Sequence, residues 1–391
     1  MSTDWIRCKL GEMITLKRGY DLPEQERQPG PYPVVSSSGT IAYHAKSKVR
    51  GPGVVTGRYG TLGEVFFIDG DFWPLNTSLY VEDFKGNDKR FVSYFLRQLN
   101  LAAQNAAGAV PGVNRNHLHA IDIRVPPVDA QREIARVLVG YDRLIANNQR
   151  RIQVLERLVR GLFREWFVHF RFPGSEGVDL VQSPIGRIPN GWNVTSLGRV
   201  AVVNRNQISV RAAPQTLHYI DISSVSPGRI DSTTCYAFGE APSRARRIVA
   251  HGDILWSTVR PNRRSHALVL NPRPNTIAST GFAVISAQSV PYVFLYQVVT
   301  TDEFVAYLTN HATGAAYPAV TAATFEQADL LAPPISLLDR FSELATPMAE
   351  QIDVLHRQIA NLSATRDLLL PRLMSGRLTL PEAEDAVPVS L

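Results

Sequence analysis

Apolar residues recur in two long stretches of the chain at alternating steps of four and three. The first stretch runs from Ile134 to Trp166, and the second runs from Phe341 to Leu373. Alternating steps of this kind keep apolar side chains on one face of an α-helix at the period of a coiled coil. The pattern therefore predicts two helices of about 40 residues, each roughly 60 Å long at about 1.5 Å per residue.

Each predicted helix needs a partner, because an apolar stripe of that length would otherwise face water. We expect the two helices to pack against each other and not on their own globular halves. One polar residue interrupts each stripe, Asn148 in the first and Arg366 in the second. A polar residue at such a position more often sets register than forms a site. The expected helix-pair interface consists of Ile134, Leu138, Tyr141, Ile145, Asn148, Ile152, Leu155, Val159, Leu162, Met348, Ile352, Leu355, Ile359, Leu362, Arg366 and Leu369.

Two prolines fall in the second stretch. Thr346-Pro347 suits a helix start, with threonine as the cap and proline at the first helical position. Residues 336–345 are therefore expected to form a separate turn or a kinked lead-in. Pro371 should kink or end the helix, because proline has no N–H to donate and its ring clashes with the preceding turn.

The two stretches belong to one long internal repeat. The pair Pro126-Pro127 precedes the first stretch, and Pro333-Pro334 precedes the second, 207 residues further on. The starts of the two halves also match, since Trp5 corresponds to Trp192 at an offset of 187 residues. The difference between the offsets places about twenty extra residues in the second globular half, in loops.

Short apolar runs bounded by Gly, Asp and Asn indicate strands in each globular half. Each half is therefore expected to be α+β with a strand-rich core. The expected elements are strands over 53–57, 64–68 and 79–81 with a helix over 91–101, then strands over 253–257, 267–270 and 282–285 with a helix over 292–308.

The predicted architecture is α+β, with two similar globular domains separated by two long antiparallel helices that form a coiled coil, and with an internal pseudo-twofold repeat. Gly and Pro mark a linker between the halves, and the end of the chain is expected to be flexible. The expected bounds are 1–127 for the first domain, 128–170 for the first helix, 171–190 for the linker, 191–334 for the second domain, 335–376 for the second helix and 377–391 for the tail.

Composition changes this picture little. A chain of 391 residues suits two or three domains, and its net charge of +6 favours a polyanionic partner, with solubility as the other explanation. Cys8 and Cys235 share no metal-ligand spacing and fit a reducing compartment. No signal peptide or membrane-spanning run is visible, so a cytoplasmic protein without membrane contact is expected.

No motif for nucleotide hydrolysis, dinucleotide binding, amino-methyl transfer or zinc-dependent hydrolysis occurs in the sequence. His117 and His119 lack a nearby carboxylate or thiol cluster, and we interpret them as surface or loop residues. The run 36–39 (Ser-Ser-Ser-Gly) is interpreted as a turn and not as a nucleophile elbow. The sequence therefore predicts no catalytic residue, metal site or cofactor in this chain.

Basic residues cluster with Gly, Asn and aromatic residues in predicted loops of both halves. Arg and Lys neutralise phosphates, and Arg and Asn can bond the edges of guanine and adenine. For a single residue a solvated charge is an equally good explanation, but for the two arginine clusters of the second half we favour DNA contact. The candidate DNA-binding residues are Lys46, Lys48, Arg50, Arg58, Tyr59, Thr61, Asn114, Arg115, Arg244, Arg246, Arg247, Arg260, Asn262, Arg263 and Arg264.

The order of these motifs resembles the specificity subunit of type I restriction-modification enzymes over nearly the whole chain. The second half departs from the pattern at 257–261 (Ser-Thr-Val-Arg-Pro), where the Gly-Thr-x-Gly element of the first half is lost. The motifs that carry the resemblance are Trp5 with Leu10-Gly11, Trp192 with Leu197-Gly198, Arg58-Tyr59-Gly60-Thr61-Leu62-Gly63, Gly108-Ala109-Val110-Pro111-Gly112-Val113-Asn114, Asp129-Ala130-Gln131-Arg132-Glu133-Ile134 after the first Pro-Pro pair, and Leu369-Leu370-Pro371-Arg372-Leu373-Met374-Ser375-Gly376.

The resemblance implies two target recognition domains that read a split, asymmetric site on double-stranded DNA. It also implies that the chain is not itself an enzyme. Its expected partners are two methyltransferase subunits, which use S-adenosylmethionine, and motor-nuclease subunits, which use ATP and Mg. These cofactors are expected on the partner subunits and not on this chain.

Two other classes of function stay open at this point. One is a structural coiled-coil adaptor that bridges proteins without reading DNA, which gel-shift competition between specific and random duplex would separate from a specificity subunit. The other is a stand-alone nuclease or methyltransferase. The missing motifs argue against that class, and an activity assay on the isolated chain would decide it.

Overall fold

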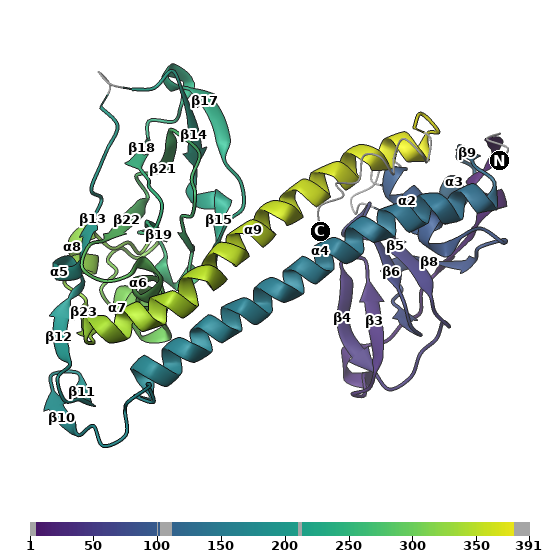
Figure 1. The fold of residues 1–391 in the computed structure, drawn as a ribbon. Helices are drawn as coiled ribbons and strands as arrows, with labels where there is room; N and C mark the ends of the chain where they lie inside the picture. Colours follow the sequence, from purple (N-terminus) through teal and green to yellow (C-terminus); the bar gives the residue numbers. More distant parts are fainter. Residues whose placement is uncertain (1–4, 100, 102–111, 210–212, 379–391) are drawn as a thin grey trace. The chain divides into compact units, whose positions relative to one another are not determined.

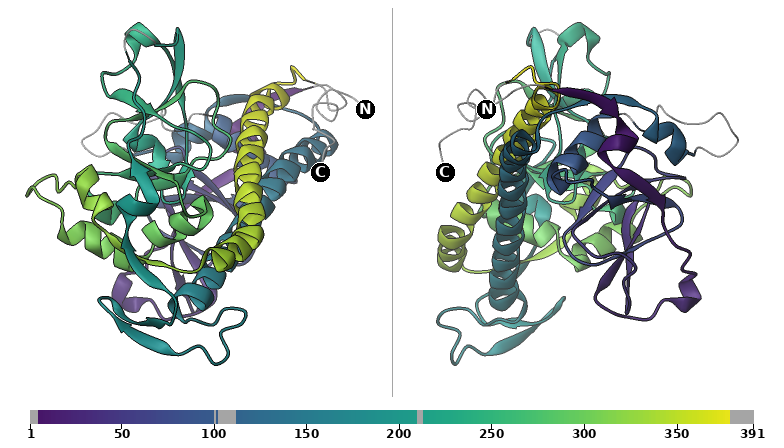
Figure 2. Two further views of the ribbon diagram at one scale, coloured as in Figure 1. Left: turned by 60° about the vertical axis from the view of Figure 1, so that its left-hand side comes forward. Right: turned by 90° about the vertical axis from the view of Figure 1, so that its right-hand side faces the viewer.

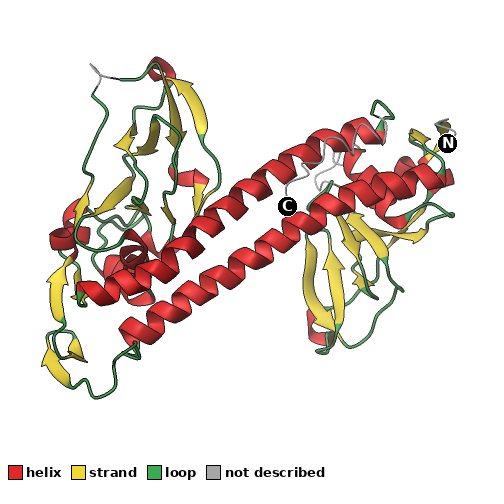
Figure 3. Cartoon of the chain, in the orientation of Figure 1, coloured by secondary structure: helices red, strands yellow, loops and turns green. Residues whose placement is uncertain are grey.

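The computed structural model describes residues 5–99, 101, 112–209 and 213–378. The chain divides into two compact units, residues 1–148 with 358–391 and residues 149–357. Each unit contains one strand-rich globular part and half of each of two long helices (Figures 1 and 3). The prediction of an α+β fold with an internal repeat is confirmed.

The first unit is built on a four-stranded antiparallel sheet in the order β2-β8-β5-β6, beside a three-stranded sheet in the order β4-β3-β7. A further strand pair, β1-β9, joins the start of the chain to the segment that leads into the first long helix. The elements are β1 (Ile6–Lys9), α1 (Leu10–Met13), β2 (Thr15–Arg18), β3 (Tyr32–Ser36), β4 (Gly39–His44), β5 (Gly53–Gly57), β6 (Val65–Ile68), β7 (Trp73–Pro74), β8 (Ser78–Asp83), α2 (Lys89–Gln98), α3 (Arg115–His119) and β9 (Asp122–Val125).

The second unit repeats this plan. Its sheet β13-β22-β19-β20 corresponds to β2-β8-β5-β6, and its pair β12-β23 corresponds to β1-β9. The elements are β12 (Asn193–Ser196), α5 (Leu197–Val200), β13 (Ala201–Val203), β14 (Thr216–Ile220), β15 (Val225–Ser226), β16 (Arg229–Ile230), β17 (Thr234–Ala237), β18 (Ala245–Ile248), β19 (Ile254–Ser257), β20 (His266–Leu268), β21 (Thr276–Ser279), β22 (Phe282–Ala287), α6 (Tyr292–Val299), α7 (Asp302–Asn310), α8 (Ala322–Glu326) and β23 (Asp329–Ala332).

The smaller sheets of the two units also correspond, with one addition. Strand β3 pairs antiparallel with β4 and parallel with β7, and β14 pairs in the same way with β17 and β21. In the second unit this sheet gains β18 at its edge, and the short hairpin β15-β16 follows β14. The extra residues of the second half are therefore not confined to loops, because they also build strands.

The strand predictions are confirmed in place, whereas the helix predicted over 292–308 is wrong in detail. Two helices, α6 and α7, occupy that region. The break lies at Thr301, whose side-chain oxygen accepts a hydrogen bond of 3.2 Å from the Phe304 N–H and so caps α7. The turn predicted for the serine run joins β3 to β4, with Gly39 at a φ of 101°.

The two long helices are α4 (Val128–Phe163), which continues into a π-helical turn over Arg164–Val168, and α9 (Ile335–Met374). The expected break near Pro347 is wrong, because α9 passes through it without interruption. Pro347 is exposed, whereas Phe341 and Ala345 just before it are fully buried. Burial of that apolar face holds the first turns of α9 in helical form, and the bond lost at proline lies on the solvent side. Past Pro371, α9 ends at Met374.

In the first unit, the first half of α4 and the last half of α9 pack antiparallel (Figure 2). Leu138 and Tyr141 from α4 share one core with Leu369 and Leu373 from α9. Asn148 donates a hydrogen bond of 3.1 Å to the Gln358 side chain across the pair. Every position expected in the helix-pair interface is buried or half-buried.

The same core contains side chains of the globular part, including Phe91 and Phe95 of α2. The stripe on α4 therefore packs on both α9 and the first globular half. The expectation that the helices would not pack on their own halves is wrong. The physical reason is that the stripe is wider than one helix can cover, so the sheet-and-helix layer completes its burial.

A polar network crosses the helix pair of the first unit. Arg366 of α9 donates a bond of 2.6 Å to Asp142 of α4, and Tyr94 of α2 donates to the same carboxylate. Burial, and next the bond to Asp142, raise the pKa of the Tyr94 hydroxyl, so it stays a donor. The network joins three elements through one half-buried carboxylate.

The second unit uses an aromatic cluster where the first uses the polar network. The ring centroids of Phe167 and Phe294 lie 4.9 Å apart, and Phe341 and Trp192 pack around Phe167. The repeat offset of 207 places Val159 at the position of Arg366, and Val159 belongs to this apolar core. The two halves of the helix pair therefore differ: an apolar core with a polar network beside it in the first unit, and a cluster of aromatic rings in the second.

The segment predicted as a linker, 171–190, contains an antiparallel hairpin of β10 (Leu180–Ser183) and β11 (Gly186–Pro189). Of the expected tail, only Arg377 and Leu378 lie within the described residues. In the part of the chain that is described, no helix is both long and apolar enough to cross a membrane.

Replacing Asp142 by alanine should lower the free energy of unfolding by about 1–2 kcal/mol, because Tyr94 and Arg366 would lose their shared acceptor in a half-buried place. Urea unfolding would measure the change. The matched control is Asp367→Ala, since Asp367 also pairs with Arg366 but is 63% exposed; its effect should stay within about 0.5 kcal/mol. Equal effects of the two substitutions would contradict the role of the network.

Candidate nucleic-acid interface

The candidate DNA-binding residues occupy corresponding places in the two units. In the first, the basic run 46–50 lies at the edge of the smaller sheet, where the N–H groups of Lys48 and Val49 both donate to the Phe72 carbonyl at 3.0 Å. In the second, Arg246 and Arg247 of the arginine run lie in β18, which pairs antiparallel with β21 at the same edge, and Arg244 directly precedes that strand. The fold therefore places two unrelated basic sequences at one equivalent position.

A second set of candidates lies in the loop that follows β5. Here the Arg58 N–H donates to the Thr77 carbonyl at 2.9 Å, and the Val113 N–H donates to the Arg58 carbonyl at 2.9 Å. Tyr59 forms a bridge with Gly112 in the same place. These bonds hold the loop between the sheet and the segment that precedes α3.

Two glycines permit this close approach. A Cβ atom on Gly57 would lie 1.9 Å from the Thr61 carbonyl oxygen, and one on Gly112 would lie 2.4 Å from the Tyr59 ring. Gly60 has a φ of 81°, a left-handed conformation that residues with a side chain rarely adopt. The glycines in this motif therefore permit the loop geometry. The residues between them are not required for it and can differ.

The second unit keeps the same frame although its sequence has lost the glycines. The Thr258 N–H donates to the Gly281 carbonyl at 2.9 Å, and the Val320 N–H donates to the Thr258 carbonyl at 2.9 Å. Val259 forms a bridge with Ala319, as Tyr59 does with Gly112. Thr258 and Val259 thus take the places of Arg58 and Tyr59.

The turn before β22 brings two of the basic segments of the second unit together. The Thr280 N–H donates to the Arg244 carbonyl at 2.8 Å, and the next residue, Gly281, accepts the bond from Thr258. The start of the arginine run and the loop after β19 therefore flank one tight turn.

Several candidate side chains are held by their own domain. Arg264 forms an ion pair with Asp302, and Arg246 lies over the Phe238 ring at 5.7 Å. The Nε atom of Arg247 is buried and has no hydrogen-bond partner among the described residues, and burial lowers the pKa of its guanidinium. These three arginines are less available to a partner than their number in the sequence implied.

In the first unit, Lys48 lies 5.1 Å from the centroid of the Trp73 ring and is partly held there by a cation–π contact. Asn114 caps α3, because its side-chain oxygen accepts a bond of 2.9 Å from the Asn116 N–H. The candidates that are exposed to solvent are Lys46, Lys48, Arg50, Tyr59, Thr61, Asn114, Arg115, Arg244, Asn262 and Arg263.

The two histidines noted in the sequence differ. His117 is exposed, whereas His119 is half-buried and its Nε2 accepts a bond of 2.9 Å from the Leu16 N–H. Burial, and next the nearby charge of Arg115, lower the pKa of His119. His119 therefore serves as a neutral acceptor that ties α3 to β2. Among the described residues, no group of three His, Cys, Asp or Glu side chains is placed to hold a metal ion.

Sequence reasoning missed Tyr317, whose side chain is 69% exposed. The Arg260 guanidinium stacks on its ring at 4.6 Å and donates to the Ala316 carbonyl at 3.2 Å. The signal was present, since residues 315–318 (Ala-Ala-Tyr-Pro) correspond to residues 108–111 (Gly-Ala-Val-Pro) at the repeat offset of 207. The first-half motif itself lies outside the described residues.

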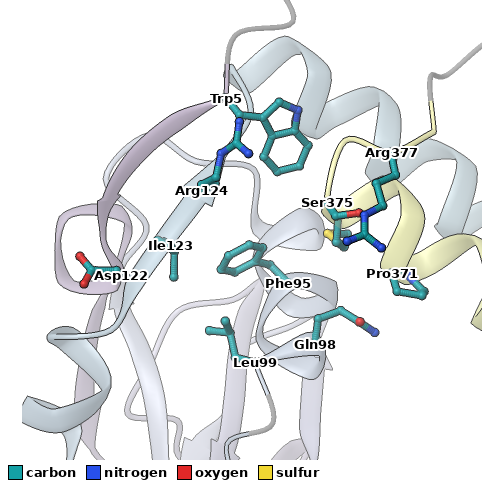
Figure 4. A pocket seen from close by; sticks show the side chains of 11 residues that line it. Trp5, Phe95, Gln98, Leu99, Asp122, Ile123, Arg124, Pro371, Ser375 and Arg377 are labelled. Carbon is teal, nitrogen blue, oxygen red and sulfur yellow. The ribbon is translucent and has the colours of Figure 1, made fainter.

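A cleft of about 440 Å³ lies in the first unit, between α2, β9 and the end of α9 (Figure 4). Phe95 and Leu99 line one side of it, and Pro371 and Ser375 line another. None of the candidate DNA-binding residues lines this cleft. At the corresponding corner of the second unit, Trp192 packs against Phe170 and Phe172.

Comparison with known proteins gives the class to which this arrangement belongs. Residues 2–157 match the family model of the type I restriction modification DNA specificity domain. The chain is also similar to two type I restriction enzyme specificity subunits of Methanocaldococcus jannaschii. It is 24% identical to the MjaIX subunit over 279 residues, which is 70% of this chain and 64% of that relative. It is 21% identical to the MjaVIII subunit over 302 residues, which is 72% of this chain and 70% of that relative.

Among solved structures, the S subunit of a type I restriction-modification system from M. genitalium superposes with a TM-score of 0.68. The match covers 95% of this chain and 96% of that one at 14% identity, so it concerns the fold. The resemblance expected from the sequence is confirmed. Residues 2–157 thus match a type I restriction modification DNA specificity domain, and the chain has the fold of a type I specificity subunit.

Replacing Gly57 by alanine should lower the free energy of unfolding by about 1–3 kcal/mol, because the new Cβ would meet the Thr61 carbonyl. Thermal unfolding of the full chain would measure the loss. Gly70→Ala is the matched control, since a Cβ atom there has nothing within 4 Å. If both variants unfold at the same temperature, the close approach at Gly57 does not stabilise the loop.

Proposed function

We propose that this chain is the DNA sequence specificity subunit of a type I restriction-modification enzyme. Each globular domain would read one half of a split, asymmetric site on double-stranded DNA. The chain would dock two methyltransferase subunits and motor-nuclease subunits, and it would carry out no chemistry itself. S-adenosylmethionine, ATP and Mg would be bound by those partners, and the complex would act in the cytoplasm.

One observation carries the proposal. The two domains hold the same loop with the same backbone bonds, to Thr77 and Val113 in the first and to Gly281 and Val320 in the second. The side chains presented on that loop differ, as with Tyr59 and Val259. A shared backbone geometry with different side chains suits two domains that recognise different DNA sequences. A structural adaptor that does not bind DNA would not need such a pair of loops.

The charge of the loops supports the same reading. The exposed candidates in both domains are mainly basic, with Lys46 and Arg50 in the first and Arg244 and Arg263 in the second. Basic side chains on a rigid sheet edge attract the phosphate backbone and orient a duplex. Arginine and asparagine in the adjacent loops can then reach base edges.

The direct test is an exchange of residues 1–127 for the corresponding domain of another specificity subunit. The swapped chain, in complex with its methyltransferase partner, should methylate a site in which one half has changed and the other half is retained. Sequencing of methylated DNA from a host that carries the complex would read the result. The proposal fails if the exchange leaves the methylated sequence as it was.

Binding of the complex to DNA should also weaken steeply with salt. Each phosphate contact should contribute about −0.9 to the slope of log affinity against log salt concentration. Fluorescence anisotropy with a labelled duplex would measure this slope, with an unlabelled random duplex as competitor. Equal competition by specific and random duplexes would favour the structural adaptor instead.

A further inference from the structure

The left-handed position of the loop is occupied by different residues in the two domains. Gly60 takes it in the first, with a φ of 81°, and Arg260 takes it in the second, with a φ of 51°. A residue with a side chain is strained in this conformation, which has a cost in free energy. Glycine would avoid that cost. Stability of the fold therefore does not explain why arginine occupies this position.

The surroundings of Arg260 hold it in place. Its N–H donates to the Pro318 carbonyl at 2.7 Å, and its guanidinium donates to the Ala316 carbonyl and stacks on Tyr317. Backbone and side chain are thus both fixed by the segment 316–318. The guanidinium thus lies over an exposed aromatic ring with one hydrogen bond to the backbone beside it.

The first domain builds a similar pair from other positions. The Arg58 guanidinium lies 4.5 Å from the centroid of the Tyr59 ring, which is 40% exposed. In the first domain the aromatic residue lies on the loop after β5, whereas in the second domain it lies on the segment that pairs with the loop after β19. Val259 stands where the first domain has Tyr59, and in the sequence Val110, which lies outside the described residues, stands where the second has Tyr317.

Neither arginine of these pairs is neutralised by its own domain. Among the described residues, no carboxylate forms an ion pair with Arg58 or Arg260, whereas Arg264 is paired with Asp302. A guanidinium has five N–H donors in a planar fork. The bonds to Asn76 and Tyr59 for Arg58, and to Ala316 for Arg260, leave other donors of each fork unused.

We propose that Arg58 stacked on Tyr59, and Arg260 stacked on Tyr317, have the same role as base-reading elements, one in each domain, although they occupy different positions of the loop. Each stacked guanidinium would donate two bonds to one guanine of its own half-site in the major groove. Stacking orients the fork and leaves its outer edge for the base. This inference rests on the proposed function and adds the residues that set one position of each half-site.

The test uses the full chain in complex with its methyltransferase, and a DNA library randomised over both half-sites. Arg260→Gly is the informative variant, because glycine fits the left-handed position and reproduces Gly60. It should fold at least as well as the parent chain while losing discrimination at one position of the half-site read by the second domain, by about 5- to 150-fold. The other half-site should be unchanged.

Two further variants separate the parts of the pair. Arg260→Lys should lose the same discrimination, because an ammonium cannot make the two-bond contact. Tyr317→Phe keeps the stacking ring and should retain the preference, whereas Tyr317→Ala should weaken it. In the first domain, Arg58→Ala should relax one position of the other half-site only. Arg199→Ala, which removes an exposed arginine of the second domain outside both basic segments, should give the parent profile.

Other outcomes would overturn the inference. A uniform loss of affinity over all sequences, with a salt slope reduced by about one, would make Arg260 a phosphate contact. An unchanged profile for Arg260→Gly would make the pair structural. If the parent complex itself shows no sequence preference, the proposed function fails, which is a different result from failure of the pair alone.

Discussion

Burial of two apolar stripes is the constraint on which the rest of this structure depends. The stripes on α4 and α9 are too long and too wide to face water, and one helix cannot cover the other completely. In each unit, half of one helix therefore packs against half of the other, and the globular part closes the remaining side. Leu138 with Phe91 in the first unit and Phe341 with Phe294 in the second show this shared burial. The long helices are thus part of the hydrophobic core of each unit.

The two halves of the helix pair meet that constraint with different chemistry. The first unit joins Asp142, Arg366 and Tyr94 in a polar network, whose half-buried charges tolerate few alternative alignments. The second unit packs aromatic rings around Phe167, which contribute burial with less demand on alignment. Because the interface residues differ, a helix segment of one unit is not suited to pair with the wrong segment of the other helix.

The two globular domains likewise share a backbone geometry but differ in the side chains that they present. Backbone hydrogen bonds hold the loops after β5 and β19 in one geometry, and such bonds depend little on side-chain identity. Side chains on the loops can therefore change without loss of the fold. Arg260 at the position of Gly60 is the clearest case, since a residue poorly suited to the conformation is held by bonds to Pro318 and Ala316.

The sequence by itself determined the two long helices, the repeat and the central strands β5, β6, β8, β19, β20 and β22, because each depends on periodicity or composition over a short range. The other strands carried too weak a local pattern to be predicted. It could not decide the course of the chain at Pro347, since the local preference for a helix start was overridden by burial of Phe341 and Ala345. Nor could it show which arginines are available, because the partner of Arg264 lies 38 residues away and that of Arg260 lies 56 residues away. Contacts over such separations are set by how the sheets bring loops together. Only the tertiary structure therefore distinguished a neutralised arginine from one that is free to bind.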